Sequence, residues 1–381
     1  MCGIVGAVAQ REVPGILLEG LRRLEYRGYD SAGMAVITGA AKLDTRKEVG
    51  KVQTLADALD SAPLLGHLGI AHTRWATHGQ PSEVNAHPHC SGDIALVHNG
   101  IIENHAELRE RLAKLGYVFV SQTDTETVVH LMHYHYRQSG DLLTALRDTI
   151  PELDGAYGLA VIHAKEPHRL ICARKGSPLV IGMGIGENFI ASDQLALRQV
   201  TDRFVYLEEG DIAEIYTDNY IIRDSDFNLV SRDITQIDTA AETTDKGIYR
   251  HYMLKEIYEQ PAVIRRSLLG RLGAKRILAE AMGARAEEIL KTVSSIQIVA
   301  CGTSYHAGMV AKYWIEGLAG VPCRVEVASE FRYRKFKVQE NTLLVTISQS
   351  GETADTLAAL RLAKTLGYSA SLTVCNVAQS S

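Results

Sequence analysis

Short segments rich in apolar and β-branched residues fill most of the first 230 residues, and this pattern limits the fold more than any other feature. Such segments are typical of β-strands. Only residues 15–24, 106–115 and 125–137 show the apolar spacing of amphipathic helices. Because the strands mostly follow one another directly, we expect stacked antiparallel sheets flanked by helices, an α+β arrangement. The predicted strands are residues 2–8, 33–37, 69–73, 94–98, 156–163, 170–174, 189–192, 204–208 and 211–216.

The pattern changes towards the C-terminus. Residues 221–250 are polar and are interpreted as a linker, and residues 251–293 as a helical connecting segment in which Pro261 predicts a kink or a helix start. From residue 294 to residue 381, strand, loop and helix occur twice and a third strand follows. This alternation favours an α/β parallel sheet that is incomplete, because a doubly wound domain usually has more strands. The predicted elements are strands 296–300, 342–347 and 371–375 and helices 309–318 and 356–366.

Composition argues against several classes of function. The net charge of −5 gives no reason to expect nucleic acid or an anionic membrane as a partner. The apolar runs are far shorter than the roughly 20 residues that span a bilayer, and no secretory signal is visible. The six cysteines form no CxxC pairs, which favours reduced thiols in the cytoplasm. The segment HPHC at 87–90 is interpreted as a turn, so we expect no metal and no cofactor.

Cys2 directly follows the initiator methionine and precedes the apolar stretch IVGAV. Chain ends are usually poorly ordered, whereas this one has strand composition, so we expect it to be built into a sheet. Removal of Met1 would give Cys2 a free α-amino group, and its pKa of about 7.7–8 suits a general base. Thiol and base would then lie on one residue, as in N-terminal nucleophiles. Position alone favours the alternative, a small buried cysteine with no chemical role.

Four polar segments lie next to predicted strands, where binding groups often collect. Asn99 and Gly100 could offer a side-chain and a backbone N–H to an oxyanion, although Asn-Gly is also a common turn dipeptide. Arg74 suits a carboxylate and Asp124 an ammonium group, so together they could bind a free amino acid. Either residue could instead be solvated or paired within the fold. The segments are HTRWATHG (72–79), NAHPHC (85–90), VHNGIIEN (97–104) and SQTDTE (121–126).

These segments, with MCGIVGAV and EYRGYDSAG (25–33), resemble the class II glutamine amidotransferase domain of the N-terminal nucleophile hydrolases over residues 2–220. The resemblance implies a four-layer αββα fold. It also implies that Cys2 attacks the side-chain amide of glutamine, which releases ammonia and leaves a γ-glutamyl thioester for water. By the same resemblance, Asn99 and Gly100 form the oxyanion hole and Arg27 supports the nucleophile.

The resemblance further assigns the residues that would bind glutamine. Arg74 and Asp124 fall on the positions that hold the carboxylate and the amine, and Thr77, His78 and Gly100 on positions that line the site. Trp75 falls on a position that gates the passage of ammonia.

Two loops rich in Ser, Thr and Gly, CGTSYHAG (301–308) and SQSGETADT (348–356), each follow a strand and precede a helix. Backbone N–H groups at helix N-termini form anion sites, and ligands of open α/β sheets bind at the carboxyl ends of the strands. One such loop alone would more often be an ordinary helix cap. No P-loop lysine follows either loop, so a nucleoside triphosphate is not expected.

The two loops resemble the sugar isomerase domain, a flavodoxin-like α/β fold that binds phosphosugars. The resemblance implies that six side chains hold the sugar phosphate and nearby hydroxyls, namely Thr303, Ser304, Ser348, Gln349, Ser350 and Thr353.

In this order, the two halves resemble a family of glutamine-dependent aminotransferases that make glucosamine 6-phosphate from fructose 6-phosphate. KGIYRHYMLKEIYEQP (246–261) resembles the segment that joins the halves in this family. The resemblance implies glutamine and fructose 6-phosphate as partners, an internal path for ammonia, and a homodimer at full length.

The family continues into a second isomerase subdomain, which supplies the sugar-opening lysine and acid–base residues. We therefore expect these 381 residues to hydrolyse glutamine without the full synthase activity. Two alternatives remain open: ammonia delivered to phosphoribosyl diphosphate or to an ATP-activated acid, and a non-catalytic module that binds phosphosugars.

Overall fold

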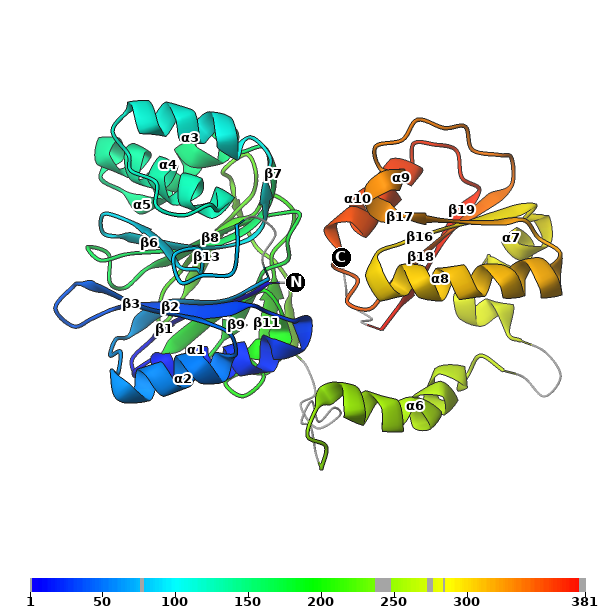
Figure 1. The fold of residues 1–381 in the computed structure, drawn as a ribbon, viewed down its shortest axis with the longest axis horizontal. Helices are drawn as coiled ribbons and strands as arrows, with labels where there is room; N and C mark the ends of the chain where they lie inside the picture. Colours follow the sequence, from blue (N-terminus) through cyan, green and yellow to red (C-terminus); the bar gives the residue numbers. More distant parts are fainter. Residues whose placement is uncertain (1, 76–78, 237–247, 273–276, 284, 377–381) are drawn as a thin grey trace. The chain divides into compact units, whose positions relative to one another are not determined.

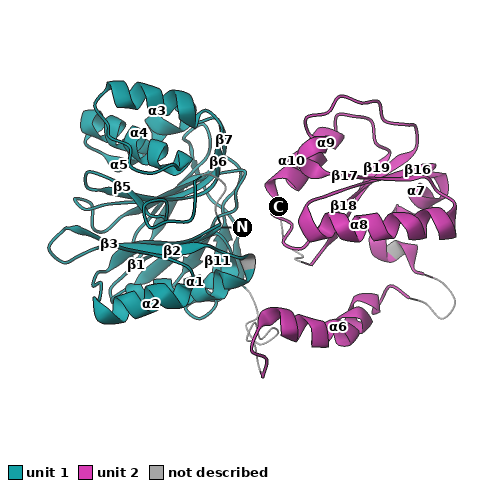
Figure 2. Cartoon of the chain, viewed as in Figure 1, with its two compact units in different colours: residues 1–243 teal, residues 244–381 magenta. Residues whose placement is uncertain are grey.

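The computed structural model describes residues 2–75, 79–236, 248–272, 277–283 and 285–376. The chain forms two compact units, Met1–Thr243 and Thr244–Ser381 (Figure 2). Their boundary lies inside the stretch that the sequence predicts as a linker. Each unit is described below by itself.

Two stacked antiparallel sheets form the centre of the N-terminal unit (Figure 1). In its described residues, the first sheet has the order β15-β11-β9-β10-β1-β4-β2-β3 and the second β14-β13-β12-β8-β7-β6-β5. The first contains β1 (Gly3–Ala9), β2 (Ser31–Ile37), β3 (Leu43–Val49), β4 (Leu68–Arg74), β9 (Val180–Met183), β10 (Glu187–Ala191), β11 (Arg203–Tyr206) and β15 (Ile234–Gln236). The second contains β5 (His89–Ser91), β6 (Ile94–Ile102), β7 (Gly155–His163), β8 (Leu170–Lys175), β12 (Ile212–Ile215), β13 (Tyr220–Arg223) and β14 (Leu229–Val230).

Helices cover the outer face of each sheet. Helices α1 (Pro14–Leu24) and α2 (Val52–Ser61) pack on the first sheet in one apolar cluster. Helices α3 (His105–Lys114), α4 (Asp124–Ser139) and α5 (Leu142–Thr149) pack on the second sheet in another. A third cluster, which includes Ile4 and Val97, fills the space between the sheets. These layers confirm the predicted αββα fold.

Most predicted strands of this unit are present, with ends shifted by a few residues. Several strands that the structure contains were not predicted. Strand β3 has the sequence LDTRKEV and lies at the edge of its sheet. Because most of its side chains are charged or polar, it lacks the run of apolar residues by which a strand is predicted. Strands β14 and β15 lie in the polar stretch that was interpreted as a linker, and they pair with β13 and β11. Edge strands contribute little apolar surface, and their polar side chains resemble those of loops.

A parallel sheet with the order β17-β16-β18-β19 forms the core of the C-terminal unit. The predicted parallel sheet is confirmed, although strand β17 was not predicted. Pro261 lies inside helix α6, so of the two predicted alternatives the helix start is wrong, and the kink stays a prediction. The elements in chain order are α6 (Tyr252–Leu268), α7 (Ala286–Thr292), β16 (Ser295–Ala300), α8 (Gly302–Trp314), β17 (Cys323–Val327), α9 (Ala328–Phe331), β18 (Thr342–Ser348), α10 (Ala354–Ala363) and β19 (Ala370–Cys375). None of the helices in the described ranges is long and apolar enough to span a bilayer.

Candidate functional site

Cys2 directly precedes strand β1, which begins beside the end of strand β4. Gly3 pairs with Thr73, and the chain beyond β4 brings Trp75 next to the cysteine. The backbone N–H of Trp75 donates to Cys2 Sγ over 3.2 Å. Burial raises the pKa of the Cys2 thiol above its usual value, and the Trp75 N–H, which favours the thiolate, opposes this only in part. The thiol therefore needs a base to become a nucleophile at neutral pH.

Asn99 reaches Cys2 from the second sheet. The Asn99 Nδ2 donates to the carbonyl oxygen of Cys2 over 3.2 Å, and Asn99 Oδ1 lies 2.9 Å from His72 Nε2. Asn99 pairs with Gly158 in β7 and lies inside strand β6. The Asn-Gly dipeptide is therefore not a hairpin turn, and the amide of Asn99 contacts the backbone of the residue that carries the thiol.

Gly100 follows Asn99 at a point where strands β6 and β7 approach closely. Its φ is +131°, and a Cβ atom built on it would lie 2.0 Å from the carbonyl oxygen of Ala156. A residue with a side chain is excluded by both the backbone conformation and the space. Glycine is thus required at this position by the fold itself.

Asp124 and Arg74, the predicted amino-acid binders, are both buried. Asp124 begins helix α4, where its Oδ2 accepts the N–H of Ile102 over 2.9 Å and so joins the helix to the end of β6. Arg74 Nη2 donates to the carbonyl oxygen of Gly79 over 3.3 Å, and its Nη1 lies 3.8 Å from Asp30 Oδ1. Each residue therefore has contacts within the fold as well as the charge that a substrate would need.

The remaining predicted site residues of this unit are described to different extents. Thr77 and His78 lie outside the described residues, as does the side chain of Arg27, whose backbone belongs to the one-turn helix Glu25–Arg27. The Trp75 side chain is 53% exposed and packs against Gly28, where a Cβ would lie 2.4 Å from the indole ring.

Buried histidines form a cluster next to Asn99, and the sequence analysis did not predict this cluster. His72 stacks on His87 with ring centroids 4.2 Å apart, and His87 contacts His89 edge-on at 5.0 Å. Burial lowers the pKa of His72 to about 3 and holds the pKa values of His87 and His89 well below their usual range. These imidazoles are neutral at physiological pH. Within the described residues, no group of three His, Cys, Asp or Glu side chains could hold a metal ion.

The two Ser/Thr loops of the C-terminal unit meet at one edge of its sheet, because β16 and β18 are parallel neighbours. Thr303 and Ser304 lie in the first turn of α8. In the second loop, Ser348 Oγ accepts the N–H of Gly351 over 3.0 Å, and Ser350 Oγ that of Glu352 over 3.1 Å. Gln349 is exposed, and Thr353 precedes α10 with its Oγ1 3.4 Å from Ser348 Oγ. The predicted phosphate-binding residues thus gather at the carboxyl ends of two strands.

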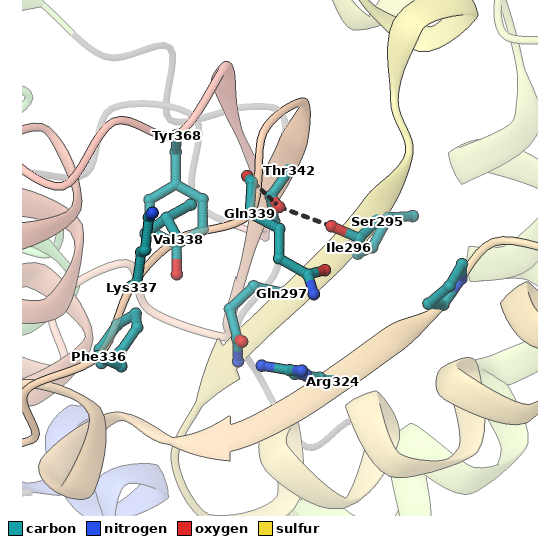
Figure 3. Close-up of a pocket in the computed structure, with 11 residues that line it drawn as sticks. Ser295, Ile296, Gln297, Arg324, Phe336, Lys337, Val338, Gln339, Thr342 and Tyr368 are labelled. Atoms are coloured by element: carbon teal, nitrogen blue, oxygen red, sulfur yellow. Dashed lines mark hydrogen bonds between the residues drawn. The ribbon is translucent and has the colours of Figure 1, made fainter.

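A cavity of about 180 Å³ lies at the amino-terminal end of the same sheet. Figure 3 shows Gln297 and Gln339 directed into it, with Lys337 and Arg324 nearby and a 2.6 Å hydrogen bond between Ser295 and Thr342. Because its residues come from the starts of β16, β17 and β18, the cavity is at the opposite edge from the Ser/Thr loops. It therefore does not form part of the predicted sugar-phosphate site.

Two family models match separate parts of the chain. Residues 72–199 match the family model of a glutamine amidotransferase domain, and residues 289–381 match that of a SIS domain. The whole chain is 64% identical to the glutamine–fructose-6-phosphate aminotransferase [isomerizing] of Pseudomonas aeruginosa, covering 62% of that protein. It is 60% identical to the protein of the same name from Vibrio vulnificus, again over 100% of this chain and 62% of the relative. By sequence, the chain is similar over its whole length to part of these glutamine–fructose-6-phosphate aminotransferases.

Solved structures with lower identity share the fold. The glutamine phosphoribosylpyrophosphate amidotransferase of B. subtilis aligns with 98% of this chain and 81% of its own, at 18% identity and a TM-score of 0.50. A structure described as the allosteric regulatory enzyme of purine biosynthesis aligns with 98% of this chain and 80% of its own, at 19% identity and a TM-score of 0.51. The chain spans less than two thirds of the length of its aminotransferase relatives.

Proposed function

We propose that the N-terminal unit hydrolyses glutamine, with Cys2 as the nucleophile. The observation that carries the proposal is the Asn99 amide, which crosses between the two sheets to lie 3.2 Å from the Cys2 carbonyl. An amide donor in contact with the residue that carries the thiol, next to a glycine without a side chain, supports the donor pair that an acyl-transfer oxyanion requires.

The reaction proceeds in two steps once Met1 has been removed. The α-amino group of Cys2 takes the proton from Sγ, and the thiolate attacks the side-chain carbonyl carbon of glutamine. Asn99 Nδ2 and the N–H of Gly100 stabilise the resulting oxyanion. Its collapse breaks the C–N bond, and the ammonium group returns the proton so that ammonia leaves. Water, deprotonated by the same amine, then attacks the γ-glutamyl thioester and releases glutamate.

The remaining residues of this unit bind the substrate or guide the product. Arg74 and Asp124 hold the α-carboxylate and α-amine of glutamine, with Thr77 and His78 lining the site and Arg27 supporting the nucleophile. The burial of both charged groups supports this role, because a buried charge gains most from a partner of opposite sign. Trp75, whose backbone N–H contacts the thiol and whose indole is exposed, gates the passage of ammonia.

For the C-terminal unit, we propose a sugar-phosphate site formed by Thr303, Ser304 and the loop 348–353. Hydroxyl groups and helix N-termini at one edge of a parallel sheet support the binding of a phosphate there. In the full-length enzyme, the ammonia would convert fructose 6-phosphate to glucosamine 6-phosphate. The hydrolysis of glutamine as proposed uses side chains and the α-amine alone, without a cofactor.

We also propose that the full-length protein is a cytoplasmic homodimer that binds neither nucleic acid nor a membrane. No disulfide joins any of the six cysteines, all of which lie in the described residues, and this supports a reducing compartment. Four large apolar side chains on one side of α8 and the turn after it are more than half exposed, which supports contact with another chain: Val310, Tyr313, Trp314 and Leu318.

The release of glutamate from glutamine by the 381-residue chain, with its N-terminus verified by mass spectrometry, tests the first proposal. We expect turnover by the processed chain and by the control Cys90→Ala, which alters an exposed cysteine, and none by Cys2→Ala. Full activity of Cys2→Ala would contradict the mechanism.

Calorimetry with fructose 6-phosphate tests the sugar site separately. Ser348→Ala should weaken binding by about 10–150-fold, since one hydrogen bond to a charged group contributes about 1.5–3 kcal/mol. An unchanged affinity would exclude Ser348 from the site. The 381-residue chain should form no glucosamine 6-phosphate, and detection of this product would contradict the expectation that the sugar step needs further residues.

A further inference from the structure

The orientation of the Asn99 side chain determines whether it can stabilise an oxyanion. An amide presents an oxygen on one side and an N–H₂ group on the other. In this structure the nitrogen faces the carbonyl oxygen of Cys2, at 3.2 Å, and the oxygen faces His72 Nε2, at 2.9 Å. A carbonyl oxygen can only accept, so the atom that faces Cys2 must be Nδ2. The oxygen of Asn99 consequently needs a donor on the side of His72.

We propose that His72 is a positioning residue, whose Nε2–H holds the Asn99 amide with its nitrogen turned toward Cys2. The inference rests on the proposed function of Asn99 and extends it to a residue that does not touch the substrate. If the proton were on Nδ1, two lone pairs would face each other at 2.9 Å, and a flip of the amide would relieve the repulsion. The flip would direct an oxygen at the developing oxyanion in place of a donor.

The surroundings of His72 support this single tautomer. His72 is fully buried, and within the described part of the chain its Nδ1 forms no hydrogen bond of acceptable geometry, although the backbone carbonyl of His98 interacts with the imidazole and favours its protonation. A proton on Nδ1 would therefore lack a well-aligned acceptor, whereas a proton on Nε2 has the Asn99 oxygen. Burial lowers the pKa of His72 to about 3, so a second proton is not taken up at neutral pH.

Packing fixes the plane of the ring as well as its protonation. His72 stacks on His87, and the carbonyl oxygen of His87 lies so close to β2 that a Cβ on Gly33 would be 2.1 Å from it. His89 contacts His87 edge-on, and its Nε2 lies 2.9 Å from the hydroxyl oxygen of Thr123. The imidazole of His72 is thus held between β2, β4 and the polar segment 85–90.

Kinetics of glutamate release test the proposal with two variants. Gln places an N–H near the position of Nε2, so His72→Gln should keep kcat within about threefold of wild type, whereas His72→Leu removes the donor. Loss of one oxyanion donor lowers kcat by about 10²–10³-fold, so loss of its orientation in His72→Leu should lower kcat by about 10–100-fold with little change in KM. In an Asn99→Ala background, the same substitution should have almost no further effect, because the amide that it orients is absent.

A full additional loss in the Asn99→Ala background, or equal losses in His72→Gln and His72→Leu, would overturn the proposal. The tautomer is tested independently of activity by ¹⁵N NMR of histidine-labelled wild-type protein. We expect an Nε2–H imidazole that does not titrate between about pH 5 and 8. An Nδ1–H tautomer would overturn the proposal even if His72→Leu failed to fold. If the wild type released no glutamate, the proposed function would fail, and the NMR result would still decide the orientation of Asn99.

Discussion

Gly100→Ala should damage the fold and the site together, because Gly100 is confined by both its backbone angle and its neighbours. At a φ of +131°, a residue with a side chain is strained by about 1–3 kcal/mol. The new Cβ would lie 2.0 Å from the Ala156 oxygen, about 1.4 Å inside ordinary contact. Strands β6 and β7 must separate to relieve this, and each lost ladder hydrogen bond costs about 1 kcal/mol. The expected loss of unfolding free energy is about 3–5 kcal/mol.

Gly116→Ala is the matched control. Gly116 also has a positive φ, +90°, but a Cβ there would meet nothing within 4 Å. This variant should therefore pay only the conformational cost of about 1–3 kcal/mol. Urea unfolding can be followed by Trp75 fluorescence in a Trp314→Phe background, since the chain contains 2 tryptophans. Equal destabilisation by the two variants would refute the argument from the close approach of β6 and β7.

Three further outcomes follow from the site. Gly28→Ala should displace the Trp75 indole, because the added Cβ would lie 2.4 Å from the ring; an unchanged Trp75 fluorescence spectrum would contradict this. Asp124→Asn should raise KM for glutamine more than it lowers kcat and should slow turnover less than Cys2→Ala; a purely kcat effect would place Asp124 outside the binding site. Below about pH 6.5 His72 is protonated in the unfolded chain, whereas in the folded chain it stays neutral down to about pH 3. The free energy of unfolding should therefore decrease as the pH is lowered through this range, by up to about 1.4 kcal/mol per pH unit. Urea midpoints at about pH 7.5 and 5 should therefore differ less in His72→Gln than in wild type, and an equal difference would contradict this account.

The sequence predicts the layered part of the fold because apolar periodicity records burial. Helix α1 buries Ile16, Leu17, Leu21 and Leu24 on one face, and this spacing is visible without a structure. Strand β3 shows no apolar periodicity, since none of its residues is fully buried at the edge of the sheet. Strand β15 is three residues long and is defined by its pairing with β11, which no local pattern reveals.

The candidate site also combines features that the local sequence predicts with features that only the pairing of strands defines. Polar segments next to strands indicated Asn99 and Asp124 as candidates, and the structure brings Asn99 into contact with Cys2. The inference from local sequence also allowed a turn at Asn99–Gly100, and only the pairing of β6 with β7 shows a continuous strand there. The role of His72 was not predicted, because the register of two different sheets decides that it meets Asn99. Contacts between sheets depend on how whole layers stack, and a single segment carries no information about them.

Mass spectrometry of the acid-quenched protein during glutamine turnover tests the central claim most directly. The account predicts a γ-glutamyl group on the peptide that begins with Cys2, at its sulfur, that disappears when glutamine is exhausted. It also predicts that Asn99→Ala slows the appearance of this adduct. Release of glutamate with no adduct on Cys2, at a rate that Cys2→Ala leaves unchanged, would contradict it.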